Sequence, residues 1–221
     1  MSSTAASTAS AVRRSRTHRI AVTAMLSAAA TVLMFLEFPI PFLIPSFVEL
    51  DFSELPALLA AFSLGPVSGV VVCLVKNVIK GLLFSGTGGV GEMCNFLLGI
   101  CFVIPAGVIY RYKKTRSGAL IGALAGAAVM AVCSVPVNYF ISYPVYTKFL
   151  PIDVIISMYQ EIIQSFNGLL ARLGAPFSLP AVNGLLGCLI AFNAPFTLLK
   201  GLLDTALCFL IYKPLSPLLH K

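Results

Sequence analysis

Residues 55–84 read LPALLAAFSLGPVSGVVVCLVKNVIKGLLF, an apolar stretch that is divided by Gly65 and Pro66. The part from Pro66 onward is long enough to cross the hydrocarbon core of a membrane, which takes about 20 helical residues. The part before the glycine, residues 55–64, is too short to cross at about 1.5 Å per residue. The stretch therefore predicts either one long span or a short helix that turns into a full span at the glycine and proline.

The composition of the whole chain is that of a membrane protein. Of its 221 residues, 58% are hydrophobic and 10% are charged, whereas an ordinary soluble domain has roughly 25% charged residues. Four more apolar stretches have the length of a span: residues 20–38, 90–110, 119–143 and 194–212. We therefore predict an all-α integral membrane protein, because helices satisfy their own backbone hydrogen bonds in lipid.

Basic residues gather in three places, and these places decide between the two arrangements. One cluster precedes the first apolar stretch, RYKKTR occupies residues 111–116, and Lys213, His220 and Lys221 lie near the end of the chain. Basic connections favour the cytoplasmic side of a membrane, which accounts for the net charge of +7 without a nucleic-acid partner. With the amino terminus inside, RYKKTR also falls inside only if residues 55–64 form a separate segment. The sequence therefore predicts a six-transmembrane-helix bundle, with one helix short or tilted and both termini cytoplasmic.

One membrane domain accounts for most of the chain. Its predicted bounds are residues 19–213, with a disordered basic cytoplasmic tail over residues 1–18 and a second cytoplasmic tail over residues 214–221. A basic run before an apolar run is also typical of a signal peptide. The length of the apolar run and the lack of a clear cleavage site favour a retained first helix.

The loop over residues 39–51 reads PIPFLIPSFVELD, and it is unusual for a connection between helices. It is too apolar for a solvated loop and too rich in proline for a helix. Irregular backbone in a membrane protein packs against protein or lines a cavity. We therefore predict a structured external loop between helices one and two that closes over a small-molecule pocket and gates binding and release.

A second external feature is an amphipathic pattern over residues 152–173, within the connection formed by residues 144–193. Apolar residues recur there at helical spacing, with polar residues between them. Such a helix lies on the membrane surface, packs over the outward mouth of the bundle, or is a surface helix without a ligand role.

Four strings resemble a known transporter family: FLEFPIPF (35–42), LDFSELPALLAAFSLGPVSGV (50–70), VKNVIKGLLFSGTGGVGEMCNFLLG (75–99) and FNAPFTLLKG (192–201). They are similar to the S component, or substrate-binding subunit, of energy-coupling factor (ECF) vitamin transporters, and to the riboflavin-specific type in particular. The resemblance extends from about Arg19 to Tyr212. It implies a six-helix protein of the bacterial plasma membrane that binds riboflavin from outside with high affinity. A transmembrane coupling subunit and two ATPases are its implied partners.

Two alternatives to this reading remain. One is an S component for another vitamin or a flavin precursor. The other is a membrane enzyme of lipid metabolism, which needs paired carboxylates, a nucleophile or a metal. The eight acidic residues contain no DxxxD or DDxxD pattern, and both histidines are terminal, so we expect no enzyme and no metal or cofactor site. Gly86, Gly88 and Gly91 match G-x-G-x-x-G, but they follow a membrane helix rather than a strand and predict no nucleotide site.

Polar residues inside apolar helices are the candidate ligand contacts, because they are costly at membrane depth. Thr197 and Lys200 lie three residues apart on one helix face. The resemblance implies that a polar residue three before a lysine contacts the flavin, although the family usually has Asn where Thr197 stands. Snorkelling of Lys200 to the interface is the alternative.

The remaining candidates lie on other segments. Asn138 offers an amide donor and acceptor to one edge of a flat ring, as the resemblance implies, or it makes a bond between helices. Glu92 and Asn95 share a face after the glycine turn and suit ribityl hydroxyls, although Glu92 also suits a helix amino terminus. Asp51, which ends the loop, and Ala57 are further candidate ligand contacts.

Four more charged or polar side chains are not predicted to contact a ligand. Ser53 and Glu54 are expected to cap the short helix. Lys76 and Lys80 are left without a role; Glu92, Asp51 and Glu37 are their possible partners.

Small residues on the first helix predict a partner surface. Ala24 and Ala28 form a small-xxx-small pair, with Ala21 close by, and such pairs let helices approach closely. The resemblance implies that alanines of this helix contact the coupling subunit. Packing inside the bundle is the alternative.

Overall fold

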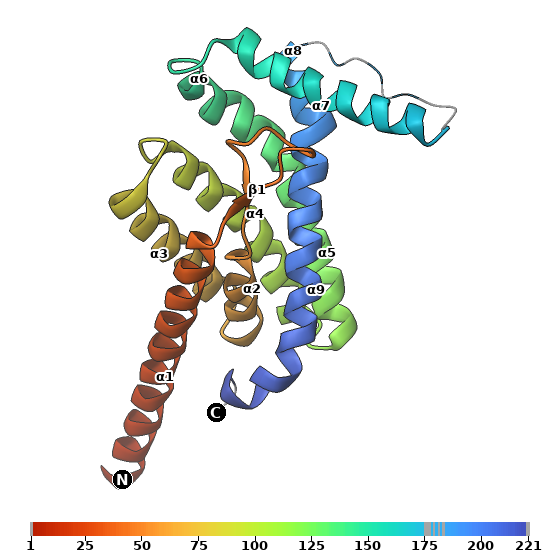
Figure 1. The fold of residues 1–221 in the computed structure, drawn as a ribbon. Helices are drawn as coiled ribbons and strands as arrows, with labels where there is room; N and C mark the ends of the chain where they lie inside the picture. The colour runs from red at the N-terminus through yellow and green to blue at the C-terminus, as the bar shows by residue number, and fades with distance from the viewer. Residues whose placement is uncertain (1, 175–177, 179, 181, 183, 220–221) are drawn as a thin grey trace.

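The computed structural model of the chain describes residues 2–174, 178, 180, 182 and 184–219, with side chains described between residues 16 and 211 of these. It is a helical molecule with one pair of very short strands (Figure 1). The elements in chain order are α1 (Ser2–Phe35), β1 (Phe38–Pro39), β2 (Glu49–Leu50), α2 (Glu54–Ser63), α3 (Pro66–Phe84), α4 (Val90–Tyr112), α5 (Arg116–Val137), η1 (Asn138–Ser142), α6 (Tyr143–Tyr146), α7 (Ile152–Arg172), α8 (Gly184–Cys188), η2 (Leu189–Asn193) and α9 (Ala194–Leu219).

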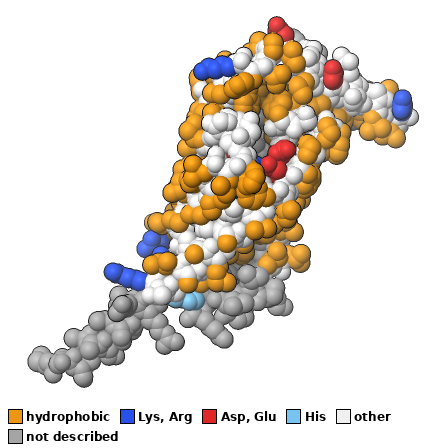
Figure 2. Space-filling view, turned by 60° about the vertical axis from the view of Figure 1, so that its left-hand side comes forward, with side chains coloured by type: hydrophobic (Ala, Val, Ile, Leu, Met, Phe, Trp, Pro, Cys, Tyr) orange, Lys and Arg blue, Asp and Glu red, His pale blue; other side chains and the backbone are white. Residues whose placement is uncertain are grey.

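Five helical stretches in the described part of the chain are apolar and long enough to cross a membrane. They are Arg16–Phe35, Pro66–Phe84, Val90–Tyr112, Arg116–Tyr146 and Gly184–Ile211. Their outer surfaces carry large exposed hydrophobic side chains such as Leu82, Val132 and Leu210. Figure 2 shows such side chains over most of one face, with basic groups near its two ends. This surface suits a lipid solvent.

The short helix α2 is separate from α3, as its length and the positions of the basic clusters predicted. It has ten residues, and nine of them are buried. Gly65 ends it with a φ of 104°, and Pro66 begins α3 immediately afterwards. Only glycine adopts such a φ at little cost, and proline is favoured at the first position of a helix. The turn therefore fixes α2 in the core of the bundle.

The α4 and α5 helices approach each other closely through glycines of α5. A Cβ atom on Gly122 would lie 2.7 Å from the carbonyl oxygen of Ala106, and one on Gly126 would lie 2.3 Å from that of Phe102. Neither distance leaves room for a methyl group. Gly122 and Gly126 of α5 therefore serve packing within the bundle.

The 39–51 loop is more regular at its ends than the sequence predicted. Phe38 pairs with Leu50 and Pro39 with Glu49 in an antiparallel ladder, so the expectation of purely helical secondary structure is corrected by these four residues. Pro39 has no N–H to donate, which is tolerated where only two strands pair. The ladder brings both ends of the loop together, and Ile44 between them is fully buried.

The termini lie at one end of the bundle and α7 lies across the other end (Figure 1). α7 begins at Ile152 and buries Ile155, Tyr159, Ile162 and Ile163 against the bundle. The predicted amphipathic helix is thus present, and it packs over the end of the bundle. α1 already begins at Ser2 and α9 runs to Leu219, so residues 2–18 and 214–219 of the predicted tails continue these helices. Residues 220 and 221 lie outside the described part.

Replacing Gly126 tests the close approach of α4 and α5. We expect Gly126→Ala to lower the free energy of unfolding by about 1–3 kcal/mol, because the added methyl group meets a backbone carbonyl that cannot move alone. Gly168→Ala in α7 is the matched control, since nothing lies within 4 Å of its added Cβ. There we expect no loss, or a gain of about 0.5–1 kcal/mol. Thermal unfolding in lipid nanodiscs measures both, and equal stability of the two variants would contradict the packing described here.

Candidate functional site

A cavity of about 350 Å³ lies between the 39–51 loop and the ends of α1, α3, α4, α5 and α9. Its volume lies within the range of roughly 300–1,000 Å³ that is usual for small-molecule sites. Six of the predicted ligand contacts line it: Asp51, Glu92, Asn95, Asn138, Thr197 and Lys200. The structure therefore brings together side chains that are as much as 149 positions apart.

Ala57, the seventh predicted contact, does not line the cavity. It is fully buried in the core, and its carbonyl oxygen lies where a Cβ on Gly69 would come within 2.9 Å. The residue thus belongs to the packing of α2 against α3.

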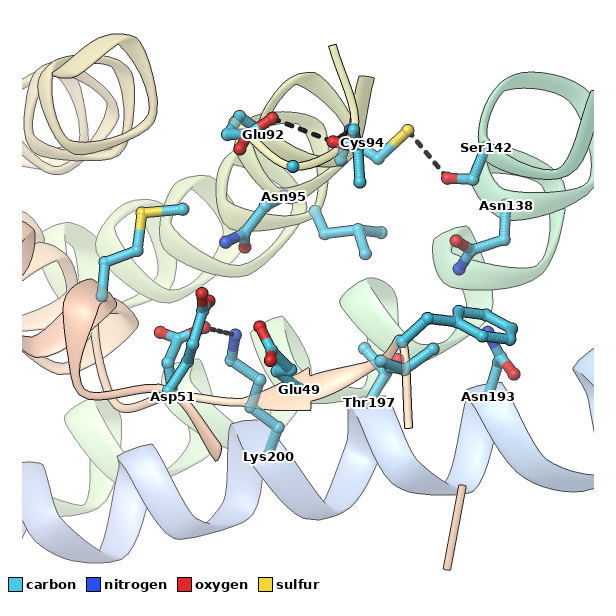
Figure 3. Close-up of a pocket in the computed structure, with 18 of the residues that line it drawn as sticks. Glu49, Asp51, Glu92, Cys94, Asn95, Asn138, Ser142, Asn193, Thr197 and Lys200 are labelled. Atoms are coloured by element: carbon cyan, nitrogen blue, oxygen red, sulfur yellow. Dashed lines mark hydrogen bonds and ion pairs between the residues drawn. The ribbon is translucent and has the colours of Figure 1, made fainter. Parts of the chain in front are cut away.

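One wall of the cavity is formed by α9. Thr197 and Lys200 point from it into the cavity (Figure 3). The Lys200 ammonium donates to Asp51 Oδ2 at 2.8 Å, and its side chain is only 12% exposed. Lys200 therefore does not snorkel to the interface but binds the end of the 39–51 loop.

A second lysine, Lys76, does not line the cavity but is connected to the Lys200–Asp51 ion pair through Ser53. Lys76 of α3 donates to Ser53 Oγ at 2.5 Å and to Glu54 Oε1 at 2.6 Å, and the Lys76 and Glu54 side chains are 0% and 1% exposed. Ser53 in turn donates its hydroxyl to Asp51. We call the side chains of Asp51, Ser53, Glu54, Lys76 and Lys200 the buried polar cluster. It connects the loop, α2, α3 and α9.

The predicted positions of Ser53 and Glu54 at the start of α2 are confirmed, because Ser53 is the N-cap residue and Glu54 lies in the first turn, but the predicted capping bond is absent. Both side chains instead serve the buried ammonium of Lys76. The physical reason is that an unpaired buried ammonium costs far more than a missing cap.

The electrostatic setting of Asp51 follows from the two lysines. Burial by itself raises the pKa of this carboxyl, but the charges of Lys200 and Lys76 outweigh the burial and hold the pKa below its ordinary value. Hydrogen bonds from Lys200 and Ser53 act in the same direction. Asp51 is therefore an ionised acceptor at neutral pH.

Amide and carboxyl groups of α4 and η1 face Lys200 across the cavity (Figure 3). Asn138 donates one N–H to the carbonyl of Ser134 in its own chain segment at 2.8 Å, which is a bond within one helix rather than between helices. Glu92 accepts hydroxyl bonds from Ser85 at 3.0 Å and Thr87 at 3.2 Å. Glu92 thus fastens the glycine turn before α4 while it lines the cavity.

Sequence reasoning missed Asn193, which also lines the cavity and is 3% exposed. Tyr159 of α7 donates to Asn193 Oδ1 at 2.6 Å, and the Tyr143 and Tyr159 hydroxyl oxygens are 2.5 Å apart. Burial, together with the neighbouring Tyr143, raises the pKa of Tyr159 above its ordinary value, so this hydroxyl remains a donor. An Asn in the apolar run FNAPF was the signal that could have found this residue.

Three more charged residues at the cavity were not predicted as contacts. Glu37, Glu49 and Lys80 all line it, and Lys80 forms an ion pair with Glu37. Burial, a hydrogen bond with Glu37 and the charge of Glu37 raise the pKa of Glu49. This group joins the base of β1 and the β2 strand to α3.

The sequence matches a family model described as "ECF transporter, substrate-specific component" over residues 18–212. The chain belongs to this family. S components serve transport, so the chain is a multi-pass membrane protein of a transporter family and not of an enzyme family.

Named relatives of this S component extend over nearly its full length. Riboflavin transporter RibU of Staphylococcus aureus (strain TCH60) is 34% identical over 203 residues, which are 92% of this chain and 93% of the relative. Riboflavin transporter FmnP of Bacillus subtilis (strain 168) is 28% identical, with 92% and 94% covered. A solved structure described as the S component of a bacterial ECF transporter is 32% identical, with a TM-score of 0.68 over 93% of this chain and 99% of that chain.

A second hollow of this S component, of about 620 Å³, runs between α1 and α3. Ala24 and Ala28 line this hollow, and Ala21 does not. All three alanines are exposed. Arg16 and Arg19 close the hollow at the end where the chain begins. The three alanines therefore do not pack inside the bundle.

Lys76 and Lys80 are one turn apart on α3 and provide a matched pair of tests. We expect Lys76→Met to lower the free energy of unfolding by about 3–5 kcal/mol, because it leaves Glu54 charged and buried without its partner. Lys80→Met should cost less, since Lys80 and Glu37 are 13% and 23% exposed. Chemical unfolding in detergent measures both. The double variant Lys76→Met with Glu54→Met should regain most of the loss, and equal losses for the two single variants would refute this order.

Proposed function

We propose that this S component captures riboflavin from outside the cell for uptake, with ATP hydrolysed by two partner ATPases that act through a transmembrane coupling subunit. The observation that carries the proposal is the cavity, where the amides, Thr197 and Lys200 converge from three helices. The names of the full-length relatives supply the choice of riboflavin.

The lining of the cavity suits a flat ring with a polar edge and a hydroxylated chain. Met130, Phe196 and Tyr143 offer apolar and aromatic surface for the ring. Asn95 and Asn138 offer amide donors and acceptors to an imide edge. Glu49 and Glu92 accept hydrogen bonds from ribityl hydroxyls. These pairings give the imide edge and the ribityl hydroxyls of a neutral flavin hydrogen-bond partners.

The charges of the lining favour riboflavin over its phosphate, FMN. Within the described lining, the two lysines are already paired, Lys80 with Glu37 and Lys200 with Asp51. A phosphate needs cationic donors, and it would also meet Glu49 and Glu92. The neutral vitamin is therefore the preferred ligand.

The membrane arrangement that we propose has six crossing helices, of which α2 is the short one. The Arg19 guanidinium donates to the carbonyl of Leu64 at 3.0 Å, which places the α2–α3 turn beside the basic amino-terminal cluster. Both termini lie at this end of the bundle (Figure 1). The positive-inside rule makes this end cytoplasmic. The 39–51 loop and the cavity then open outward, with residues 19–213 forming the membrane domain.

Thr197 provides a test of the ligand site. We expect Thr197→Val to weaken riboflavin binding by roughly 3- to 10-fold, because it removes one hydroxyl and little else. Thr205→Val is the matched control on the same helix, since Thr205 is buried and bonds the carbonyl of Gly201 outside the cavity. Quenching of riboflavin fluorescence by the purified protein measures both. Equal affinities of the two variants would place the ligand elsewhere.

The same preparation tests the function itself. Protein purified from a riboflavin-containing host should carry a flavin absorption band. A colourless protein that also leaves the fluorescence of added riboflavin unchanged rejects the proposal and favours an S component for another vitamin or a flavin precursor.

The hollow between α1 and α3 is the proposed contact with the coupling subunit. A small-residue face lets a partner helix approach closely, and Ala24 and Ala28 present such a face. We expect Ala24→Trp to abolish co-purification of the coupling subunit while riboflavin still quenches normally. Ala29→Trp is the control, because Ala29 is exposed on α1 but does not line the hollow. Normal assembly of the Ala24 variant would exclude this surface.

A further inference from the structure

Asp204 of α9 is a carboxyl group for which the proposed site has no use. Its side chain is completely buried, and neither of its oxygens has a hydrogen-bond partner among the described residues. It follows Lys200 by four residues, so the two side chains lie on one face of α9, one turn apart. Asp204 does not line the cavity. It lies one turn beyond it, towards the carboxyl end of the helix.

The surroundings of Asp204 are charged on one side and apolar on the other. The charges that act on it are those of Lys200, Asp51, Glu54 and Lys76, which come from α9, the loop, α2 and α3. The Cys208 thiol is the next neighbour along α9. From α5, Ala127 and Met130 pack against Gly201 and bring no charge.

A count of charges indicates the state of Asp204. Lys76 binds Glu54 and Lys200 binds Asp51, so each buried ammonium already has a carboxylate. An ionised Asp204 would add a third buried negative charge with no counter-ion of its own. Such a charge is strongly unfavourable, and a buried carboxyl avoids it by taking up a proton. The buried polar cluster and Asp204 together carry no net charge when Asp204 is a carboxylic acid.

We propose that Asp204 is a proton-binding site that is linked to closure of the 39–51 loop. In the closed arrangement Lys200 is held by Asp51, and Asp204 keeps its proton. When the loop opens, Asp51 leaves with it as a solvated carboxylate. The Lys200 ammonium then turns to Asp204, which releases its proton to the water that enters the cavity. Lys200 keeps its charge throughout, so opening releases one proton and closing takes one up.

Riboflavin binding is linked to the same proton, an inference that rests on the proposed function. If riboflavin is held by the closed loop, the bound state carries one more proton than the open state. The affinity of the protein for riboflavin should then fall as the pH rises, with a limiting slope of about tenfold per pH unit. The slope extends over the pH range in which the closed state keeps the proton and the open state has lost it.

Infrared spectroscopy tests the proton site without any ligand. The chain contains three aspartates, Asp51, Asp153 and Asp204, so labelling with carboxyl-¹³C aspartate identifies their bands. Full-length protein in lipid nanodiscs at pH 7 should show the carbonyl stretch of one protonated aspartate. The band should vanish in Asp204→Asn and persist in Asp153→Asn, whose residue is exposed on α7. If Asp204→Asn fails to fold, the labelled parent still decides, because Asp51 is ion-paired and Asp153 is exposed.

The riboflavin dissociation constant between pH 6 and pH 8 tests the linkage. It should rise with pH in the parent and in Asp153→Asn, and it should be independent of pH in Asp204→Asn.

No protonated-aspartate band, or a band that survives in Asp204→Asn, overturns the proton site. A parent affinity that does not change with pH, or a slope that persists in Asp204→Asn, overturns the linkage. A protein that binds no riboflavin at any pH rejects the proposed function, and the infrared band then still decides the proton site.

Discussion

Charge compensation below the cavity is the constraint on which the arrangement of this S component depends. Lys76 is fully buried and reaches both Ser53 and Glu54, which begin α2. Lys200 reaches Asp51, the last residue of the loop before α2. Since a buried charge without a partner destabilises a protein by several kcal/mol, these bonds fix where α2 starts relative to α3 and α9. The floor of the cavity and the start of the short helix are therefore the same structural feature.

The same constraint explains why α2 is short. The chain passes from α1 through the paired strands β1 and β2 and through a loop that is itself partly in the core, since Ile44 and Leu50 are buried. α2 begins next to this buried loop and reaches the turn at Gly65 in ten residues. Backbone that is neither helix nor barrel is tolerated there because it is buried in protein and lines a cavity. A full-length helix in this place would fill the space that the 39–51 loop now encloses.

The sequence predicted those features that follow from spacing along one segment. Thr197 and Lys200 share a face because they are three residues apart. Residues 55–64 were recognised as separate from their length together with the positions of the basic clusters. Prediction from the sequence failed where the role of a side chain depends on a residue that is distant in the chain. Ser53 and Glu54 have the residue types of helix caps, and nothing within α2 shows that Lys76, 22 positions from Glu54, is buried beside them. Glu37 and Glu49 were missed for the same reason, since only the ladder between β1 and β2 brings them together.

The helix across the end of the bundle shapes the site as well as covering it. Tyr159 of α7 is fully buried and links Tyr143 to Asn193 by hydroxyl bonds. Asn138 and Asn193 lie in π turns, η1 and η2, where the helices of α5 and α9 depart from regular hydrogen bonding. Such turns are frequent at functional sites. Since Tyr159 holds the η2 amide in place, the position of α7 decides how Asn193 faces the cavity. The amphipathic segment therefore helps to shape the cavity and is not a separate surface element.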